Sequence, residues 1–143
     1  MRRWAETFDC PIYIHEREKP WVYNGGEHVE YWQGEEKSLW NSIRLVRTGG
    51  HFPGSFVLRV PYLSPKGALL TGNRLYLSRS MRHISMMDSY PNHIPLPARE
   101  LRAVVDKVLS LEFDTLYGAF SWQDLENRAR EDFLESIKRY DCL

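Results

Sequence analysis

Short apolar runs separated by glycine and polar turns fill most of the chain, and this pattern predicts a β-rich fold. The runs are of strand length and rich in β-branched and aromatic residues. We expect strands at residues 10–16, 28–33, 41–50, 55–63, 68–73 and 113–120, with residues 74–78 extending the fifth. Residues 1–8 fit the end of a helix, whereas Pro20 argues against a helix over residues 16–21.

Two segments near the end of the chain show helical periodicity instead. Residues 97–111 carry Pro97 in the first turn and an apolar stripe at Leu101, Val104, Val105 and Val108. Residues 121–140 have Ser121 and Asp124 spaced as a capping box, which predicts that the second helix begins at Ser121. Its expected stripe is Leu125, Ala129, either Phe133 or Leu134, and Ile137.

The order of the elements is strands, a loop, a helix, a strand and a helix. The loop covers residues 79–97, contains Pro91, Pro95 and Pro97, and is long enough to suggest a functional role. This order predicts an α+β protein with a mixed sheet and helices on one face. At 143 residues, we expect one domain over residues 1–143.

Composition removes several classes of function. The 19 basic and 19 acidic residues balance, so no overall charge favours nucleic acid or an anionic membrane. No run approaches the roughly 18 apolar residues of a membrane span, and the start lacks a secretory signal. We expect a cytoplasmic protein in which Cys10 and Cys142 are reduced, although a disulfide between them stays open. Abundant aromatic residues fit core packing, an oligomer surface or an aromatic ligand pocket.

The most unusual motif is the stretch GGHFPGSF at residues 49–56. His51 lies between a glycine pair and a Pro-Gly, immediately before a predicted strand. The glycines permit positive φ and Pro53 stiffens the turn, so one interpretation is a folding element in which His51 bonds to nearby backbone. The other interpretation gives His51 a metal-binding or catalytic role.

The motif GGHFPGS, followed by ALLTGN at residues 68–73 and by residues 74–120, and preceded by FDCPIYIHEREKPWV at residues 8–22, resembles the metallo-β-lactamase fold superfamily in its glyoxalase II-like hydrolase branch. The resemblance covers roughly residues 4–138 and only the C-terminal half of that fold. It implies half of a four-layer α/β/β/α sandwich made of two similar halves, with metals at the edge between two sheets. The superfamily's His-x-His-x-Asp-His motif, which supplies most metal ligands, is missing here.

The resemblance also assigns the remaining metal positions. His51 matches the third metal-binding histidine, Asn73 stands where an aspartate bridges two metals, and Ala119 falls near a last histidine ligand. A catalytic zinc needs about three protein ligands, and a second zinc needs its own set. We therefore expect no cofactor and no dinuclear hydrolase activity from an isolated monomer, with zinc on His51 as the alternative.

Other constellations are weaker. His83, Asp88 and His93 could surround one metal, but their spacing matches no standard site and favours a solvated loop or substrate lid. His15 and Glu16 end a strand and point to opposite faces. In the long loop, Arg79, Arg82 and Tyr90 could bind an anion.

Half of a sandwich leaves one face of its sheet bare. The residues expected to supply strand surface are Ile12, Ile14, Ile43, Leu45, Phe56, Leu58, Leu69 and Leu116. A monomer tolerates a bare apolar patch of only a few hundred Å². We therefore expect a homodimer in which two copies pack sheet to sheet about a two-fold axis.

Three functions remain open on the sequence. The first is a dimeric small-molecule-binding or scaffold protein without zinc hydrolase activity, or a partner for a full-length relative. The second is a metal-free lyase, isomerase or cyclase with His51 as general base, in which Tyr90, Asn73 and Trp122 shape a pocket for a neutral small molecule. The third is a metal-dependent hydrolase whose site is rebuilt across the dimer around His51.

Overall fold

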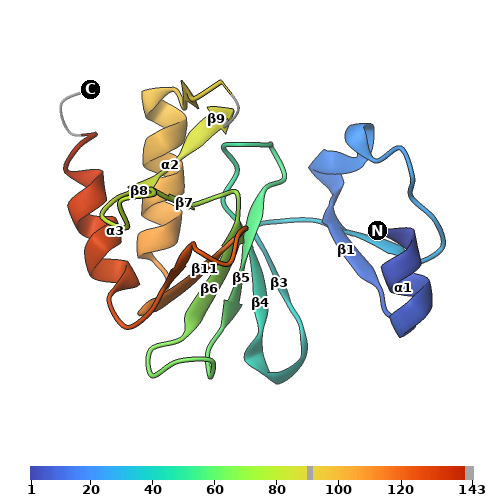
Figure 1. Ribbon diagram of the computed structural model, residues 1–143. Coiled ribbons are helices and arrows are strands. Elements are labelled where there is room, and N and C mark those ends of the chain that lie inside the picture. The colour runs from blue at the N-terminus through green and yellow to red at the C-terminus, as the bar shows by residue number, and fades with distance from the viewer. Residues whose placement is uncertain (90–91, 141–143) are drawn as a thin grey trace.

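A six-stranded mixed sheet forms the centre of the computed structural model, which describes residues 1–89 and 92–140 (Figure 1). Its strand order is β12-β11-β6-β5-β4-β3, and β6 and β11 are parallel while the other neighbours are antiparallel. The strands are β3 (Glu36–Ser38), β4 (Arg44–Arg47), β5 (Phe56–Val60), β6 (Ala68–Gly72), β11 (Thr115–Gly118) and β12 (Asp124–Leu125). The predicted α+β class with a mixed sheet is confirmed.

One face of this sheet forms the main core with two helices. Helix α2 (Ala98–Leu109) and helix α3 (Ala129–Ile137) lie on the same side of the sheet in Figure 1. Val46, Val57, Leu69 and Leu116 point to this side and are buried with Leu101, Val104 and Val108 of α2 and Phe133 of α3. The stripe predicted for the first helix is confirmed at Leu101, Val104 and Val108, whereas Val105 is only partly buried.

The second helix begins later than the sequence pattern predicts. Residues 121–128 form a turn and strand β12, and α3 starts at Ala129, so the predicted capping box of Ser121 and Asp124 is wrong. Strand pairing explains the late start of the helix, because Leu125 pairs with Leu116 and Asp124 pairs with Tyr117 on β11. The predicted stripe survives from Ala129 onward.

An N-terminal unit lies on the side of the sheet opposite α2 and α3 (Figure 1). It contains α1 (Arg2–Phe8), β1 (Ile12–His15), the 3₁₀ helix η1 (Glu16–Trp21) and β2 (Val29–Trp32), and β1 and β2 pair in parallel. A second 3₁₀ helix, η2 (Trp40–Ser42), precedes β4. The expectation that Pro20 excludes a helix is wrong, because Pro20 lies inside the short η1.

The segment expected to be a long irregular loop contains short strands. Strand β7 (Tyr76–Leu77) pairs with β8 (Ile84–Ser85), and β9 (Met87–Ser89) pairs with β10 (Ile94–Pro95). Residues 74–78 do not extend β6, since β7 joins a separate two-stranded sheet. The predicted residue Tyr90 lies outside the described residues, as does Cys142, while Cys10 is an exposed free thiol.

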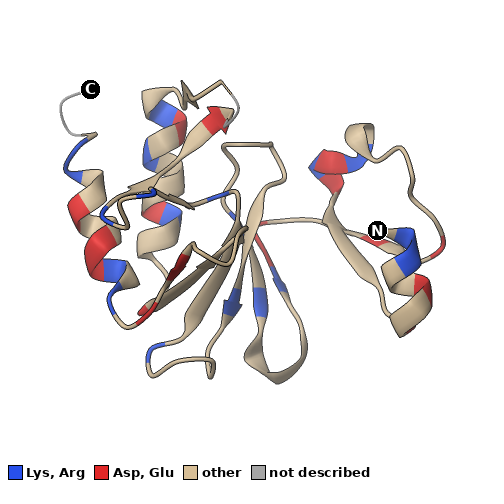
Figure 2. Ribbon diagram, viewed as in Figure 1, with Lys and Arg blue, Asp and Glu red and all other residues tan. Residues whose placement is uncertain are grey.

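Charged residues of both signs are spread over the helices and strands (Figure 2). No helix in residues 1–89 and 92–140 is long and apolar enough to cross a bilayer.

Asp114 joins three parts of the fold just before β11. Its carboxylate accepts hydrogen bonds from the Ser64 hydroxyl, the Lys66 backbone N–H and the Thr115 hydroxyl. Its carbonyl also accepts the N–H of Ala129 at 2.9 Å, at the start of α3. The hydrogen bond from Ser64 holds the pKa of Asp114 below its usual range, helped by the N–H of Lys66, while burial opposes this shift.

Replacing Asp114 with Asn is expected to lower the free energy of unfolding at pH 7 by about 1–3 kcal/mol. The amide nitrogen of Asn is a donor, so it cannot accept a hydrogen bond from the Ser64 hydroxyl or the Lys66 N–H. The depressed pKa means that the carboxylate stabilises the fold above its ordinary pKa of about 3.9. This stabilisation is lost as the pH falls through the lower folded-state pKa. Urea unfolding at several pH values measures this stabilisation. The free energies of unfolding of the wild type and of Asp114→Asn should converge in acid.

The exposed Asp106 on α2 provides the matched control, since its side chain makes no polar contact with a described residue. Asp106→Asn should leave the free energy of unfolding within a few tenths of a kcal/mol of wild type. Equal losses of unfolding free energy in Asp114→Asn and Asp106→Asn would show that the hydrogen bonds of Asp114 do not stabilise the fold.

Candidate functional site

The His51 turn closes the ends of β4 and β5, which are antiparallel neighbours. The backbone N–H groups of Thr48 and Gly49 donate to the carbonyl of Ser55 at 2.9 and 3.0 Å, and the Ser55 hydroxyl accepts the N–H of Phe52. Gly49 and Gly50 both have positive φ, 67° and 85°. The glycine pair is therefore required by the path of the backbone.

A buried arginine explains the second glycine more directly. Arg74 follows β6 and is only 3% exposed. A Cβ atom at Gly50 would lie 2.1 Å from its Nη2 atom, so the guanidinium packs against the bare backbone of the turn. Gly54 is restricted in the same way by the carboxylate of Glu18 from the N-terminal unit, which also accepts the N–H of Gly54.

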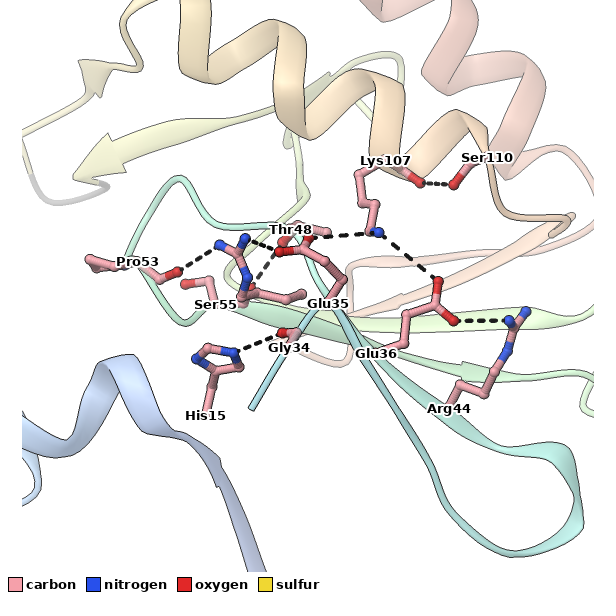
Figure 3. Close-up of polar contacts among 11 residues, drawn as sticks. His15, Gly34, Glu35, Glu36, Arg44, Thr48, Pro53, Ser55, Lys107 and Ser110 are labelled. Carbon is pink, nitrogen blue, oxygen red and sulfur yellow. Dashed lines mark hydrogen bonds and ion pairs between the residues drawn. The ribbon is translucent and has the colours of Figure 1, made fainter. Parts of the chain in front are cut away.

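On the side facing α2, an ion-pair network holds the turn (Figure 3). Arg47 donates to the carbonyl of Pro53 at 3.2 Å and pairs with Glu35. Lys107 of α2 reaches Glu35 at 3.7 Å and Glu36 at 4.0 Å. The hydrogen bond from Arg47 lowers the pKa of Glu35, and the charge of Lys107 adds to this effect. The turn is thus tied to the edge strand β3 and to α2.

On its other side, the turn borders a cleft of about 240 Å³ whose lining includes Glu18, His51, Thr71, Asn73 and Arg74. His51 is partly buried, and its Nδ1 atom lies 2.6 Å from the carbonyl oxygen of Asp88 on β9. A carbonyl only accepts, so Nδ1 carries the proton in this bond and Nε2 is the basic nitrogen of the neutral ring. We define these residues as the His51 cleft.

The structure brings together only some of the residues predicted from sequence. Asn73 lies in the His51 cleft and is exposed. Trp122 lies elsewhere, with its ring 5.9 Å from that of Tyr76 and under the guanidinium of Arg79. Ala119 is exposed, and its N–H donates to the buried Gln123.

The weaker histidine constellations are not assembled as metal sites. Nε2 of His83 bonds to Arg139, and only the backbone of Asp88 reaches a histidine. Among the described residues, no group of three or more His, Cys, Asp or Glu side chains could hold a metal ion. His15 is buried and bonds to the carbonyl of Gly34 at 3.0 Å and to the N–H of Arg17, which is a structural role.

The residues of the His51 cleft do not fit a dinuclear zinc centre. One histidine, one neutral amide and the Glu18 carboxylate, which already accepts the N–H of Gly54, cannot supply ligand sets for two zinc ions. Arg74 adds a permanent positive charge to the same cleft, which opposes a divalent cation. No step of a reaction is therefore derived through a metal here.

Sequence reasoning missed Arg74 and Glu18. Arg74 directly follows Asn73, and nothing in the local pattern shows that it is buried rather than solvated. Glu18 lies in a polar stretch that reads as a linker, and its contact spans 36 residues. Neither could be found without the tertiary arrangement.

Comparisons with known proteins agree with this fold. The chain is 43% identical over 138 residues to the uncharacterized protein YmaE of Bacillus subtilis (strain 168), covering 96% of this chain and 50% of that protein. It thus spans about half the length of this curated relative. No family model matches.

Solved structures with the same fold include β-lactamases. TMB-1 aligns with a TM-score of 0.64 and the DIM-1 metallo-β-lactamase with 0.62, each 14% identical and covering 96% of this chain but 62% of theirs. A β-lactamase from Chitinophaga pinensis aligns with a TM-score of 0.51 over 99% of this chain and 66% of its own. The resemblance to a partial metallo-β-lactamase fold is confirmed.

Gly50→Ala is expected to destabilise the protein more than Gly34→Ala. The two glycines are a matched pair, because they share nearly the same φ, 85° and 88°. Gly34 has no atom near the position of a Cβ, so its substitution costs only backbone strain of about 1–2 kcal/mol. Gly50→Ala must also displace Arg74, which adds about 1–3 kcal/mol of overpacking. Urea unfolding measures both.

The double variant Gly50→Ala, Arg74→Ala isolates the contact. In the Arg74→Ala background, Gly50→Ala should lower the free energy of unfolding by no more than Gly34→Ala lowers it in the wild type. If Gly50→Ala costs the same with and without Arg74, the guanidinium does not pack against the turn.

Proposed function

Because the chain folds as part of a metallo-β-lactamase, we propose that it is a pseudoenzyme, a dimeric small-molecule-binding or scaffold protein without dinuclear zinc hydrolase activity. The observation that carries this proposal is the buried guanidinium of Arg74 in the cleft that also holds His51 and Asn73. A dinuclear zinc site needs two sets of negative or neutral donors, and this cleft offers few such side chains, Glu18, His51 and Asn73, beside a fixed cation.

The proposed dimer is supported by the sheet face that turns away from α2 and α3. Leu45, Leu58, Leu70 and Tyr117 lie opposite one another across β4, β5, β6 and β11 and form one row on this face. Leu45 is 4% exposed, whereas Leu70 is 37% exposed. The protection given by the N-terminal unit therefore does not extend along the whole row.

A second copy is the occupant that this face fits best. Only β1 and β2 form a sheet in the N-terminal unit, whereas the lactamases extend well beyond the matched region. An isologous contact places the Leu58 and Leu70 rows of two copies against each other and covers both at once. Burial of such surface contributes roughly 25 cal/mol per Å².

Native mass spectrometry of untagged protein with added zinc is the direct test, since it reports oligomer mass and bound metal together. We expect a dimer without zinc. Leu70→Glu should give a monomer, because a carboxylate cannot be buried in an apolar interface without a partner. Leu134→Glu, at an exposed leucine on α3, should remain a dimer.

Two results would contradict the proposal. A folded monomer at micromolar concentration removes the dimer. Stoichiometric zinc that is lost in His51→Ala would instead support a hydrolase site rebuilt across the two-fold axis.

A metal-free enzyme is the second candidate, and the orientation of His51 favours it. Its Nδ1–H is directed to the carbonyl of Asp88, which makes Nε2 the nitrogen able to accept a proton. Asn73 could orient a substrate in the same cleft. Trp122 lies away from this cleft, against Tyr76 and Arg79, so it takes no part in this candidate.

Conversion of a bound compound distinguishes this enzyme from a binding protein. Ligand-observed NMR against a library of metabolites should identify a binder, and repeated spectra then show whether it changes. We expect binding without conversion. A conversion that slows at least about 100-fold in His51→Gln would support the enzyme instead.

A further inference from the structure

A cavity of about 670 Å³ lies between the β7–β8 hairpin and the end of α3. It shares no lining residue with the His51 cleft. We propose that this cavity binds a small organic anion, an apolar body that carries one carboxylate or phosphate group. This inference rests on the proposed small-molecule-binding function and gives it a place and a ligand class.

The charges of the cavity lining all have the same sign. Arg79 and Arg139 contribute guanidinium groups, and His83 and His93 add two imidazoles. No Asp or Glu is among the described residues of the lining, and neither arginine forms an ion pair with a described residue. An anion would therefore enter a region of positive potential without displacing a protein carboxylate.

The end of helix α3 opposes this field only weakly. Its carbonyl groups carry the equivalent of about half a negative charge, whereas the two guanidinium groups carry two full positive charges. The nearest acidic residue on the last turn, Glu135, is exposed and paired with Lys138. The described residues of the lining therefore give the cavity a positive potential.

Both guanidinium groups are held in place without being neutralised. Nη1 of Arg139 lies 2.8 Å from Nε2 of His83, a bond that requires the neutral imidazole to accept. Arg79 lies 5.3 Å above the ring of Trp122, which is itself fixed by an edge contact to Tyr76. Each contact uses one nitrogen or one face of the guanidinium, so further N–H donors remain to bind an oxyanion.

The remainder of the lining is suited to an apolar body. Ile84 and Met87 contribute aliphatic surface, and Tyr76 and Tyr140 contribute rings. The Ser136 hydroxyl is already used, because it donates to the carbonyl of Asp132 and accepts the N–H of Ile84. A volume of about 670 Å³ falls within the range of small-molecule sites.

The test uses ¹H–¹⁵N NMR of the full chain titrated with benzoate, phenyl phosphate and the neutral benzyl alcohol. We expect the two anions to shift the amide signals of Ser78 and Ser136 and to saturate by about 10 mM, with benzyl alcohol much weaker. The tighter of the two anions identifies the preferred group. Arg79→Gln and Arg139→Gln should each weaken binding about tenfold to a hundredfold.

Arg102→Gln is the matched control, since Arg102 is exposed on α2 and outside the cavity. It should leave the affinity unchanged, and thermal melting should show that all three variants fold. Equal weakening in Arg102→Gln, or equal binding of benzyl alcohol, would overturn the inference.

The location of the shifts separates this inference from the proposed function. Anion-induced shifts confined to Ser55 and Asn73 would overturn the anion cavity and leave a small-molecule protein that uses the His51 cleft. Absence of shifts with all three probes would overturn the anion cavity, while the dimer mass and zinc content still test the proposed function independently.

Discussion

A β-sheet has two faces, and helices cover only one face of the sheet in this chain. The covered face is closed by α2 and α3, and it holds the buried valines and leucines of the main core. The other face depends on the small N-terminal unit, which places Trp32 and Ile14 in buried positions but leaves Leu70 accessible. The exposed part of the second face follows from this unequal cover.

The His51 turn shows how a motif can persist while its chemistry changes. The glycines are explained by charged side chains that pack against the backbone, Arg74 at Gly50 and Glu18 at Gly54. Both contacts join the turn to distant parts of the chain. A sequence motif associated with metal ligands therefore has a sufficient structural reason to remain, and the cation in the cleft belongs to the protein.

Local patterns in the sequence predicted β4, β5, β6 and β11 of the main sheet and helix α2, because their apolar periodicity and their burial agree. They missed the short edge strand β3. They failed at residues 121–128, where pairing of Leu125 with Leu116 outweighs a helical pattern. The order of motifs identified the partial fold, and it placed Asn73 beside His51. The burial of Arg74 and the site of Trp122 depend on contacts between segments far apart in sequence, so no local rule could supply them.

The parallel pair β6 and β11 has a consequence for how the chain is made. Strand β6 ends at Gly72, whereas its neighbour β11 begins at Thr115, and α2 lies between them. Strands β3 to β6 pair in chain order and can assemble as each emerges from the ribosome. Until β11 follows, β6 is an open edge with unpaired backbone groups and an uncovered apolar face. Nascent chains are therefore most prone to pair with one another during that interval, and the late C-terminal strand ends it.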